Sequence, residues 1–328
     1  MSAVLKSAKL IAESVSYMHP DKICDQISDV ILDEYLKQDP LSRVAIETGG
    51  GHGQIALFGE ITSKARVNLE QIVKKYYRTL TGNDINVVSH IVTQSPEIAQ
   101  GVDTGGAGDQ GIMVGYACNE NEQYIPQEMY LARKLLKGFD VDAKAQVTIE
   151  DGAITSVVLS VQGKSQKELI THVKKCGLKV DEKKIYANYT GAFDIGGFDA
   201  DSGVTGRKIV VDAYGPRVPV GGGAFSGKDA TKVDRSAAYM ARWVALQLLK
   251  KHKAAEVLVK IGYVIGKAEP LIQSAVVDGK EVGFEYDCRP KAIIERFSLR
   301  NPIYADLAKN GHFGRIGELP WEMITAIT

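Results

Sequence analysis

The densest set of chemically useful residue types lies between residues 201 and 235. Its carboxylates can bind a metal ion or a substrate ammonium group, and its basic residues can neutralise several phosphate charges. The glycine run at 221–223 lets backbone N–H groups approach an anion closely. This combination predicts a polyphosphate site with an associated metal. The carboxylates are Asp201, Asp229 and Asp234, and the basic residues are Arg207, Lys208, Lys228, Lys232 and Arg235.

Two glycine patterns match nucleotide-binding motifs by letter but lack their structural context. Gly222 to Lys228 fits G-x-x-x-x-G-K, yet Asp229 follows where a P-loop needs Ser or Thr, and two prolines precede the glycines. Gly106 to Gly111 fits G-x-G-x-x-G, but a strand-like segment follows where a dinucleotide fold needs a helix. A loop that feeds an active site is the better interpretation of the second pattern. The first can still bind an anion, or it can be a glycine-rich connector with solvated charges.

Further candidate residues lie nearer the N-terminus. Asp21 follows His19 and Pro20 and precedes apolar residues at helical spacing. It can therefore cap a helix or bind a metal beside His19, and the spacing does not choose between these roles. Glu47 and Glu60 lie in or at the end of apolar runs, where an acidic residue either faces solvent or needs a cation.

Hydrophobic periodicity predicts the elements that must position these residues. Helices are expected at 21–37, 68–80, 127–136, 165–176, 234–251 and 291–297. Strands are expected at 43–47, 54–61, 85–93, 112–117, 145–149, 154–161, 184–189, 208–214, 257–265, 271–277 and 282–286. Strand pairs followed by helices occur three times, which predicts an α+β fold with helices covering each sheet. The residues after 297 are expected to form a polar tail.

The composition argues against several classes of partner. Forty basic and forty acidic residues give no net charge, so the local cationic cluster suits a small anion better than a nucleic acid. No apolar run approaches the ~20 residues needed to span a bilayer. The N-terminus lacks the long apolar core of a signal peptide. The four cysteines are scattered without a CxxC pair, which predicts reduced thiols in a cytoplasmic protein.

Four blocks together resemble one enzyme family. They are HPDK at 19–22, GAGDQG at 106–111, DSGVTGRK at 201–208 and GGGAFSGKD at 221–229, the last followed closely by KVDRSAAY. Their order and their sequences resemble those of the S-adenosylmethionine synthetases (methionine adenosyltransferases) of bacterial and eukaryotic type. The likeness runs from about Glu13 to Trp321. It implies three similar α+β domains about a pseudo-threefold, expected at 10–95, 106–200 and 201–322.

The resemblance also implies a reaction and its partners. The methionine sulfur would attack C5′ of ATP and expel tripolyphosphate, which is then hydrolysed to pyrophosphate and phosphate. Two Mg²⁺ and one K⁺ would assist. The enzyme would be a cytoplasmic homodimer with active sites between subunits, often paired into a homotetramer, without nucleic-acid or membrane partners. A thioether sulfur carries no proton, which fits a sequence in which no nucleophile–base pair stands out.

Roles are carried over residue by residue from the family's motifs. The resemblance implies catalytic roles for His19, Lys144, Arg207, Lys208 and Lys228. It places ATP against these residues and against Asp109, Asp142, Phe193, Asp201 and Ala224, with Phe193 stacked on adenine. It places methionine against Glu60, Gln94, Asp201 and Lys232. The expected metal ligands are Asp21 for Mg²⁺ and Glu47 for K⁺, with Asp234 supporting the Mg²⁺ region.

The chain departs from the family's pattern in three ways. The segment from Gln100 to Gly111 is several residues shorter than the usual gating loop, which predicts a reduced or absent lid. Ala192 stands where a basic residue is usual, and Val220 where a His is usual. The chain also stops soon after Trp321, without the usual tail. The charged residues assigned to phosphates are all present, so an active enzyme is expected.

Two other functions stay open. An ATP-dependent phosphotransferase could use the glycine-rich loop, although Asp229 and the missing strand–loop–helix context argue against it. A non-catalytic nucleotide-binding regulatory subunit could share the scaffold, although a pseudoenzyme would be free to lose the intact catalytic positions. Product analysis separates the three functions, because a transferase yields a sulfonium, a kinase yields ADP and a binding protein yields neither.

Overall fold

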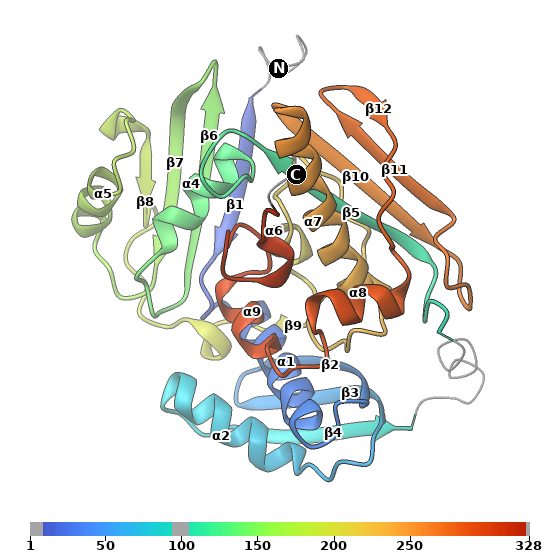
Figure 1. Cartoon of the computed structure of the whole chain (residues 1–328). Helices are drawn as coiled ribbons and strands as arrows, with labels where there is room; N and C mark the ends of the chain where they lie inside the picture. The colour runs from blue at the N-terminus through green and yellow to red at the C-terminus, as the bar shows by residue number, and fades with distance from the viewer. Residues whose placement is uncertain (1–8, 94–104, 326–328) are drawn as a thin grey trace.

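Three four-stranded sheets surround a group of helices in the computed structural model of the chain (Figure 1). The structure describes residues 9–93 and 105–325. The first sheet contains, in spatial order, β1 (Leu10–Val15), β6 (Ala143–Glu150), β7 (Ala153–Val161) and β8 (Ile185–Ala187). The second contains β9 (Gly203–Val204), β2 (Arg43–Gly51), β3 (Gln54–Thr62) and β4 (Asn86–Val92). The third contains β5 (Gly111–Cys118), β10 (Glu256–Tyr263), β11 (Ile272–Val277) and β12 (Lys280–Val282).

The sheets share a pattern of pairing. In the first and second sheets, one strand from elsewhere in the chain pairs antiparallel with a long hairpin, and the other side of the hairpin carries a parallel strand. The third sheet also receives a distant strand, β5, but it is antiparallel throughout. Each sheet therefore depends on a strand supplied by another part of the chain, and this ties the three parts together.

Each sheet contains a hairpin with a two-residue turn, at His52-Gly53, Asp151-Gly152 and Asp278-Gly279. Both residues of every turn have positive φ, between 48° and 81°. This geometry is that of the type I′ turn, whose twist matches that of the flanking strands and which favours glycine at its second position. The Asp-Gly pairs predicted two of these turns from the sequence.

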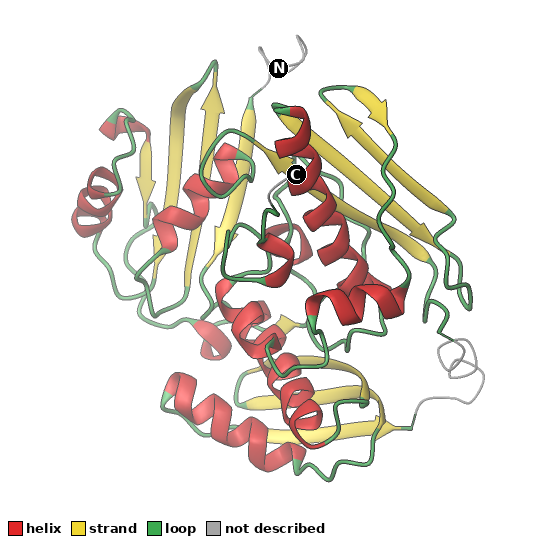
Figure 2. Cartoon of the chain, viewed as in Figure 1, coloured by secondary structure: helices red, strands yellow, loops and turns green. Residues whose placement is uncertain are grey.

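Helices cover one face of each sheet. α1 (Pro20–Gln38) packs on β2, α4 (Gln127–Leu136) packs on β1 and β6, and α7 (Val233–His252) packs on β5 and β10. Figure 2 shows α1 and α7 near the middle of the molecule, with strands around them. The other helices are α2 (Leu69–Thr81), α5 (Gln166–Lys175), α6 (Ile209–Asp212), α8 (Pro290–Phe297) and α9 (Tyr304–Asn310). Short 3₁₀ turns are η1 (Glu182–Lys184), η2 (Gly197–Asp199) and η3 (Pro320–Glu322).

The long periodic elements agree with the sequence prediction, but several short ones do not, and β1 and β9 were not predicted at all. Residues 208–214 were predicted to be a strand but contain α6, in which the N–H groups of Asp212 and Ala213 bond to carbonyls four residues earlier. A short buried apolar run fits either structure, so periodicity could not decide. β12 begins and ends earlier than the predicted strand at 282–286. The predicted polar tail instead contains α9 and part of the core.

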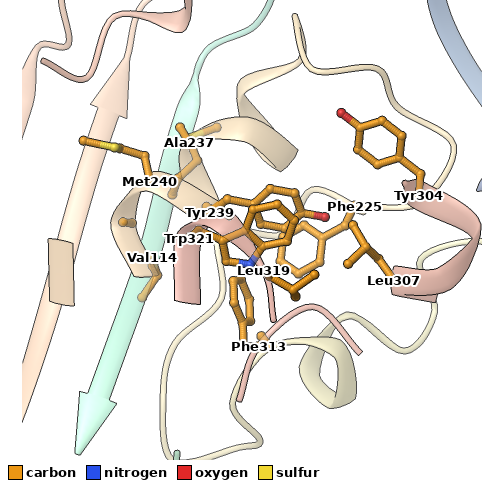
Figure 3. Packing of buried hydrophobic residues seen from close by; sticks show 14 of the residues in the cluster. Val114, Phe225, Ala237, Tyr239, Met240, Tyr304, Leu307, Phe313, Leu319 and Trp321 are labelled. Carbon is orange, nitrogen blue, oxygen red and sulfur yellow. The ribbon is translucent and has the colours of Figure 1, made fainter. Parts of the chain in front are cut away.

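The C-terminal segment packs against α7 through aromatic rings (Figure 3). The rings of Tyr239 and Trp321 are stacked with centroids 3.9 Å apart, and Phe225 and Phe313 lie around them. Next to this cluster, the carboxylate of Glu322 accepts two hydrogen bonds of 2.9 Å from Arg242, and both side chains are fully buried. The last described turn is thus a structural part of the fold.

Two further observations concern the chain as a whole. Within residues 9–93 and 105–325, no helix combines the length and apolarity needed to cross a membrane. The four cysteines all lie in these ranges and are free thiols, three of them buried.

We predict that Glu322→Ala lowers the free energy of unfolding by ~3–5 kcal/mol, because it leaves the Arg242 charge buried without its carboxylate partner. Urea unfolding at one fixed protein concentration measures this loss. Glu182→Ala is the matched control, since Glu182 pairs with Lys174 on the surface, where such a pair contributes ~1 kcal/mol or less. Equal losses in the two variants would contradict the assignment of Glu322 to the core.

Candidate active site

The start of α1 positions His19 and Asp21. His19 is the N-cap residue, and its Nδ1 accepts a hydrogen bond of 3.1 Å from the N–H of Asp21. Because Nδ1 is an acceptor, the proton of the neutral ring lies on Nε2. Asp21 is therefore not the N-cap, the plainer of the two roles that its position allowed.

Asp21 is fully buried and meets donors from residues 204–208. Its Oδ1 accepts from the N–H of Val204 at 2.9 Å and from Nε of Arg207 at 2.8 Å. Its Oδ2 accepts from Nζ of Lys208 at 2.5 Å. Burial alone would raise the pKa of this carboxyl group, but the hydrogen bonds from Lys208 and Val204 outweigh it, and the pKa is lowered. Asp21 is therefore ionised at neutral pH and paired with two cationic side chains.

His19 lies in a strongly charged environment. Burial lowers its pKa, and the positive charge of Lys208 lowers it further. The charges of Asp142 and Asp21 act in the opposite direction, and Lys144 contributes a smaller lowering. The imidazole is consequently neutral at pH 7. The structure thus brings four of the predicted residues together around His19.

Asp142 and Lys144 reach this cluster from the start of β6, which pairs with β1. Oδ2 of Asp142 accepts from the N–H of Gly197 at 3.0 Å, and Nζ of Lys144 lies 3.0 Å from Oε2 of Glu13. A cavity of ~420 Å³ is lined by residues of β1 together with Arg207 and Lys208. Small-molecule sites have volumes in this range.

A second charged pair lies at the glycine-rich loop. Nζ of Lys228 is 2.6 Å from Oδ2 of Asp234, which belongs to the first turn of α7. A Cβ on Gly223 would lie 2.1 Å from Oδ1 of Asp234, so a side chain at this position would displace that carboxylate. A Cβ on Gly206 would lie 2.5 Å from Cβ of Ala224. The glycine-rich loop is therefore packed directly against the segment that carries Arg207 and Lys208.

Glu47 and Glu60 lie on the face of the second sheet that the helices do not cover. Glu47 is exposed and stands opposite Phe58, while Glu60 stands opposite Ala45. Alternation along β3 places Phe58 and Glu60 on the same face. A backbone bridge joins Ala45 to Lys228. The glycine-rich loop thus borders a sheet face that carries two carboxylates.

In the part of the chain that the structure describes, the side chains of the remaining predicted residues form no hydrogen bond or ion pair with either cluster. Asp109 and Asp201 are exposed, and each accepts the N–H of the residue that follows it. Phe193 is half-buried, and Lys232 is buried at the N-cap of α7. Gln94 and the first part of the shortened segment lie outside the described residues.

Two residues of the 201–235 region serve the fold and are not available to a ligand. Arg235 forms a fully buried pair with Asp29, with two N···O distances of 2.7 Å. Asp229 is buried and accepts hydrogen bonds from the N–H groups of Val44 and Thr231. Their prediction as phosphate or metal ligands was wrong, because residue type and spacing cannot show that a charge already has a buried partner.

The sequence reasoning also missed the residues that hold the 201–208 segment in place. Asp25 accepts the N–H of Gly206 at 2.8 Å, and the hydroxyl groups of Thr205 and Ser28 lie 2.8 Å apart. A signal was present in the sequence. Aspartates recur every four residues along α1, a spacing that places them on one helix face among apolar residues. They are Asp21, Asp25, Asp29 and Asp33, and all are buried.

Comparison with known proteins covers nearly the whole chain. Family models of the S-adenosylmethionine synthetase N-terminal, central and C-terminal domains match residues 8–96, 104–193 and 195–323. The chain is 41% identical to the S-adenosylmethionine synthase of Brachyspira hyodysenteriae over 381 aligned positions, which cover 98% of the chain and 97% of that protein. It is 40% identical to the S-adenosylmethionine synthase of Oenococcus oeni over 373 positions, with 96% of each chain covered.

The S-adenosylmethionine synthase of Clostridium tetani is also 40% identical, over 378 positions that cover 96% of the chain and 97% of that protein. These alignments are longer than the 328 residues of the chain, so the relatives contain internal segments that it lacks. All three domains of one family are matched in order, and the chain belongs to the S-adenosylmethionine synthetase family.

Proposed function

We propose that the chain joins ATP and methionine by direct displacement at C5′ and then hydrolyses the tripolyphosphate that this releases. Membership of the family makes the chain a methionine adenosyltransferase. In the proposed step the sulfur–C5′ bond forms as the C5′–O bond breaks, and the electron pair leaves with tripolyphosphate. The sulfur becomes a sulfonium, and no proton moves. The convergence of Arg207 and Lys208 on Asp21 beside His19 is the observation that best supports this proposal.

The negative charge that develops on the leaving group would be stabilised by cations held in place before the reaction. Arg207 and Lys208 line the ~420 Å³ cavity, and Lys228 lies on the adjacent loop. Fixed charges stabilise a transition state efficiently because they need not reorganise as charge moves. Lys144 would contribute from β6 on the other side of His19.

His19 would act as a neutral hydrogen-bond donor. Its Nδ1 is engaged by the N–H of Asp21, which leaves Nε2–H free to donate to a phosphate oxygen. Its lowered pKa keeps it uncharged at neutral pH. It would therefore orient the triphosphate near the breaking bond without adding to the positive charge.

The residues present fit Mg²⁺ and K⁺ as partners of a nucleotide site. In residues 9–93 and 105–325 no three His, Cys, Asp or Glu side chains group as a metal site. Mg²⁺ is commonly bound by one or two carboxylates together with substrate phosphates, and Asp21 is an ionised, buried carboxylate with remaining acceptor capacity. Asp21 would hold Mg²⁺, with Asp234 supporting it, and Glu47 would hold K⁺. The metals would neutralise phosphate charge when bound.

Methionine would bind where two subunits meet. Glu60 would face its ammonium group, with Gln94, Asp201 and Lys232 nearby. Phe193 would stack on adenine, while Asp109 and Asp142 would line the ATP site. Several of these residues are exposed and far from forming a closed pocket within one chain, which supports an active site completed by a second copy.

The uncovered sheet faces support a homodimer, which can pair further into a tetramer. They expose large apolar side chains on every sheet: Ile11 on β1, Phe58 on β3, Val88 and Val92 on β4, Ile112 on β5 and Val204 on β9. On the second sheet, the pairing of β3 with β4 places Phe58, Val88 and Val92 on one face, and exposed apolar surface of this kind is typical of a protein interface. Phe58 shares its face with Glu47 and Glu60, so a partner on this face would reach the proposed methionine and K⁺ residues.

Two proposals concern organisation and location. The division of the chain into domains at 10–95, 106–200 and 201–322 stays a prediction. Each sheet takes three strands from one of these ranges and its fourth strand from another, so the ranges are not structurally separate. Free thiols at all four cysteines suit the reducing cytoplasm.

We predict that purified protein with ATP, methionine, Mg²⁺ and K⁺ forms S-adenosylmethionine with equal amounts of pyrophosphate and phosphate. Mass spectrometry and phosphate assays measure these products. Accumulated tripolyphosphate would contradict the hydrolysis step. ADP would identify a phosphotransferase, and bound ATP without any sulfonium product would identify a regulatory subunit.

We predict that Lys208→Met lowers kcat by about 10²–10³-fold, because it removes a fixed cation from the leaving group. The same change raises the pKa of His19, because the charge that depresses it is lost. Steady-state kinetics measures the first effect, and an NMR pH titration of the His19 ring measures the second.

Two controls accompany this prediction. Lys174→Met removes an exposed lysine of α5 and should leave both quantities unchanged. Asp142→Asn should lower the pKa of His19, because this carboxylate raises it. Shifts of the same sign in Lys208→Met and Asp142→Asn would overturn the electrostatic account of the site.

We predict that Phe58→Glu yields a monomer without turnover, since it places a charge in the proposed interface. Sedimentation velocity and activity measure the outcome. Leu41→Glu is the matched control, because Leu41 is 65% exposed and Phe58 is 54% exposed, but Leu41 lies in the turn before β2. It should leave the dimer intact. A wild-type protein that is monomeric and fully active would refute the shared site.

A further inference from the structure

A second cavity lies apart from the charged residues of the proposed active site. Its volume is ~400 Å³, which is sufficient for a small metabolite. Its walls are residues 14–17 at the end of β1, residues 136–140 at the end of α4, residues 211–212 of α6 and residues 308–311 at the end of α9. Figure 1 shows α4 beside β1, and α9 below them near α1.

Arg133 of α4 contributes a positive charge that no carboxylate in the described structure contacts. Its Nη1 donates to the carbonyl of Phe313 at 2.8 Å, and its Nη2 donates to the carbonyls of Val211 and Ala213 at 2.9 and 3.0 Å. A guanidinium has five N–H donors, so two remain unused. Burial lowers the pKa of Arg133 to about 10, which still leaves it charged at neutral pH.

Three lysines line the same cavity, and within the described residues two of them, Lys137 and Lys309, have no carboxylate partner. Nζ of Lys309 lies 4.3 Å from the centre of the Tyr17 ring, an uncharged partner. Lys137 has no ion pair among the described residues and is exposed at the end of α4. Together with Arg133, these side chains place three positive charges without a carboxylate partner around one cavity.

The carboxylates of the cavity do not cancel this charge. Asp212 shares its partner Lys22 with Asp25, because Nζ of Lys22 lies 2.5 Å from Asp212 and 3.0 Å from Asp25. Asp140 accepts a hydrogen bond of 2.9 Å from the hydroxyl of Tyr17, which turns it toward a neutral group. Arg133, Lys137 and Lys309 thus face Asp140 and the shared Asp212, and this excess of positive charge suits an anion. The ring of Phe139 offers an apolar surface in the same wall.

We propose that this cavity binds a small organic phosphate, with Arg133, Lys137 and Lys309 holding the phosphate and Phe139 contacting the organic part. Phosphate oxygens accept the donors that these side chains have to spare. The volume admits a sugar or similar group beside the phosphate. The ligand would also contact residues 14–17, which lead directly into His19.

Isothermal titration calorimetry with ribose 5-phosphate, glycerol 3-phosphate and inorganic phosphate tests the proposal. The pocket variant is Lys137→Glu with Lys309→Glu. The matched control is Lys134→Glu with Lys251→Glu, which makes the same charge change at exposed positions that do not line the cavity. The Lys208→Met variant tests whether the phosphate compound binds at the proposed active site instead of in this cavity. Turnover of the pocket variant verifies that it is folded.

We expect at least one organic phosphate to bind wild type, Lys208→Met and the matched control with similar affinity, and to bind the pocket variant at least tenfold more weakly. Amide hydrogen exchange should then slow at residues 14–17 and 136–140. Absence of binding by all three probes would overturn the proposal. If binding is lost in Lys208→Met but kept in the pocket variant, the phosphate binds at the active site instead. If inorganic phosphate binds as tightly as the organic probes, the cavity is not a site for an organic ligand.

Discussion

Four buried carboxylates on one face of α1 are the constraint on which the rest of the structure depends. A buried carboxylate is costly unless cations or N–H groups surround it, and these four draw their partners from three other parts of the chain. Asp21 binds the 204–208 segment, and Asp25 binds Gly206. Asp29 binds Gly227 and Arg235, and Asp33 binds the N–H groups of Tyr304 and Ala305. The helix therefore fixes three distant segments at once.

This constraint links stability to the proposed chemistry. The segment held by Asp21 and Asp25 carries Arg207 and Lys208, and the loop held by Asp29 leads directly to Lys228. Their backbones are fixed by contacts that a substrate need not disturb. Their side chains are less constrained: about half of the Arg207 side chain is exposed, and Lys208 and Lys228 each pair with a carboxylate at the edge of the site. A triphosphate could exchange places with those carboxylates while the backbone stays in position, as preorganised electrostatic stabilisation requires.

The sequence predicted the elements that carry a strong local signal. Asn68 and Gly82 bound α2 as N-cap and left-handed C-cap, and Ser165 forms a capping box with Glu168, so these helices ended near the predicted residues. Motif blocks identified His19, Asp21, Arg207 and Lys208, which the structure brings together. The strand exchanges between sheets left no local signal, because pairing over 130 or more residues is decided by packing. α6 was missed because its short apolar run fits a strand and a helical turn equally well.

The same constraint explains how this chain can be shorter than its relatives. The alignment to one relative spans 381 positions, whereas the chain has 328 residues. Removing a central helix or the 201–208 segment would leave a charge of α1 buried without a partner, so the elements around α1 resist deletion. Connections carry no such penalty, and closing a shorter loop costs little entropy. The hairpin turns at 52–53, 151–152 and 278–279 already have two residues, the shortest common length for paired strands. We therefore expect the shortening in this chain to fall on loops, while the charges that hold the fold, and those proposed to bind phosphate, stay in place.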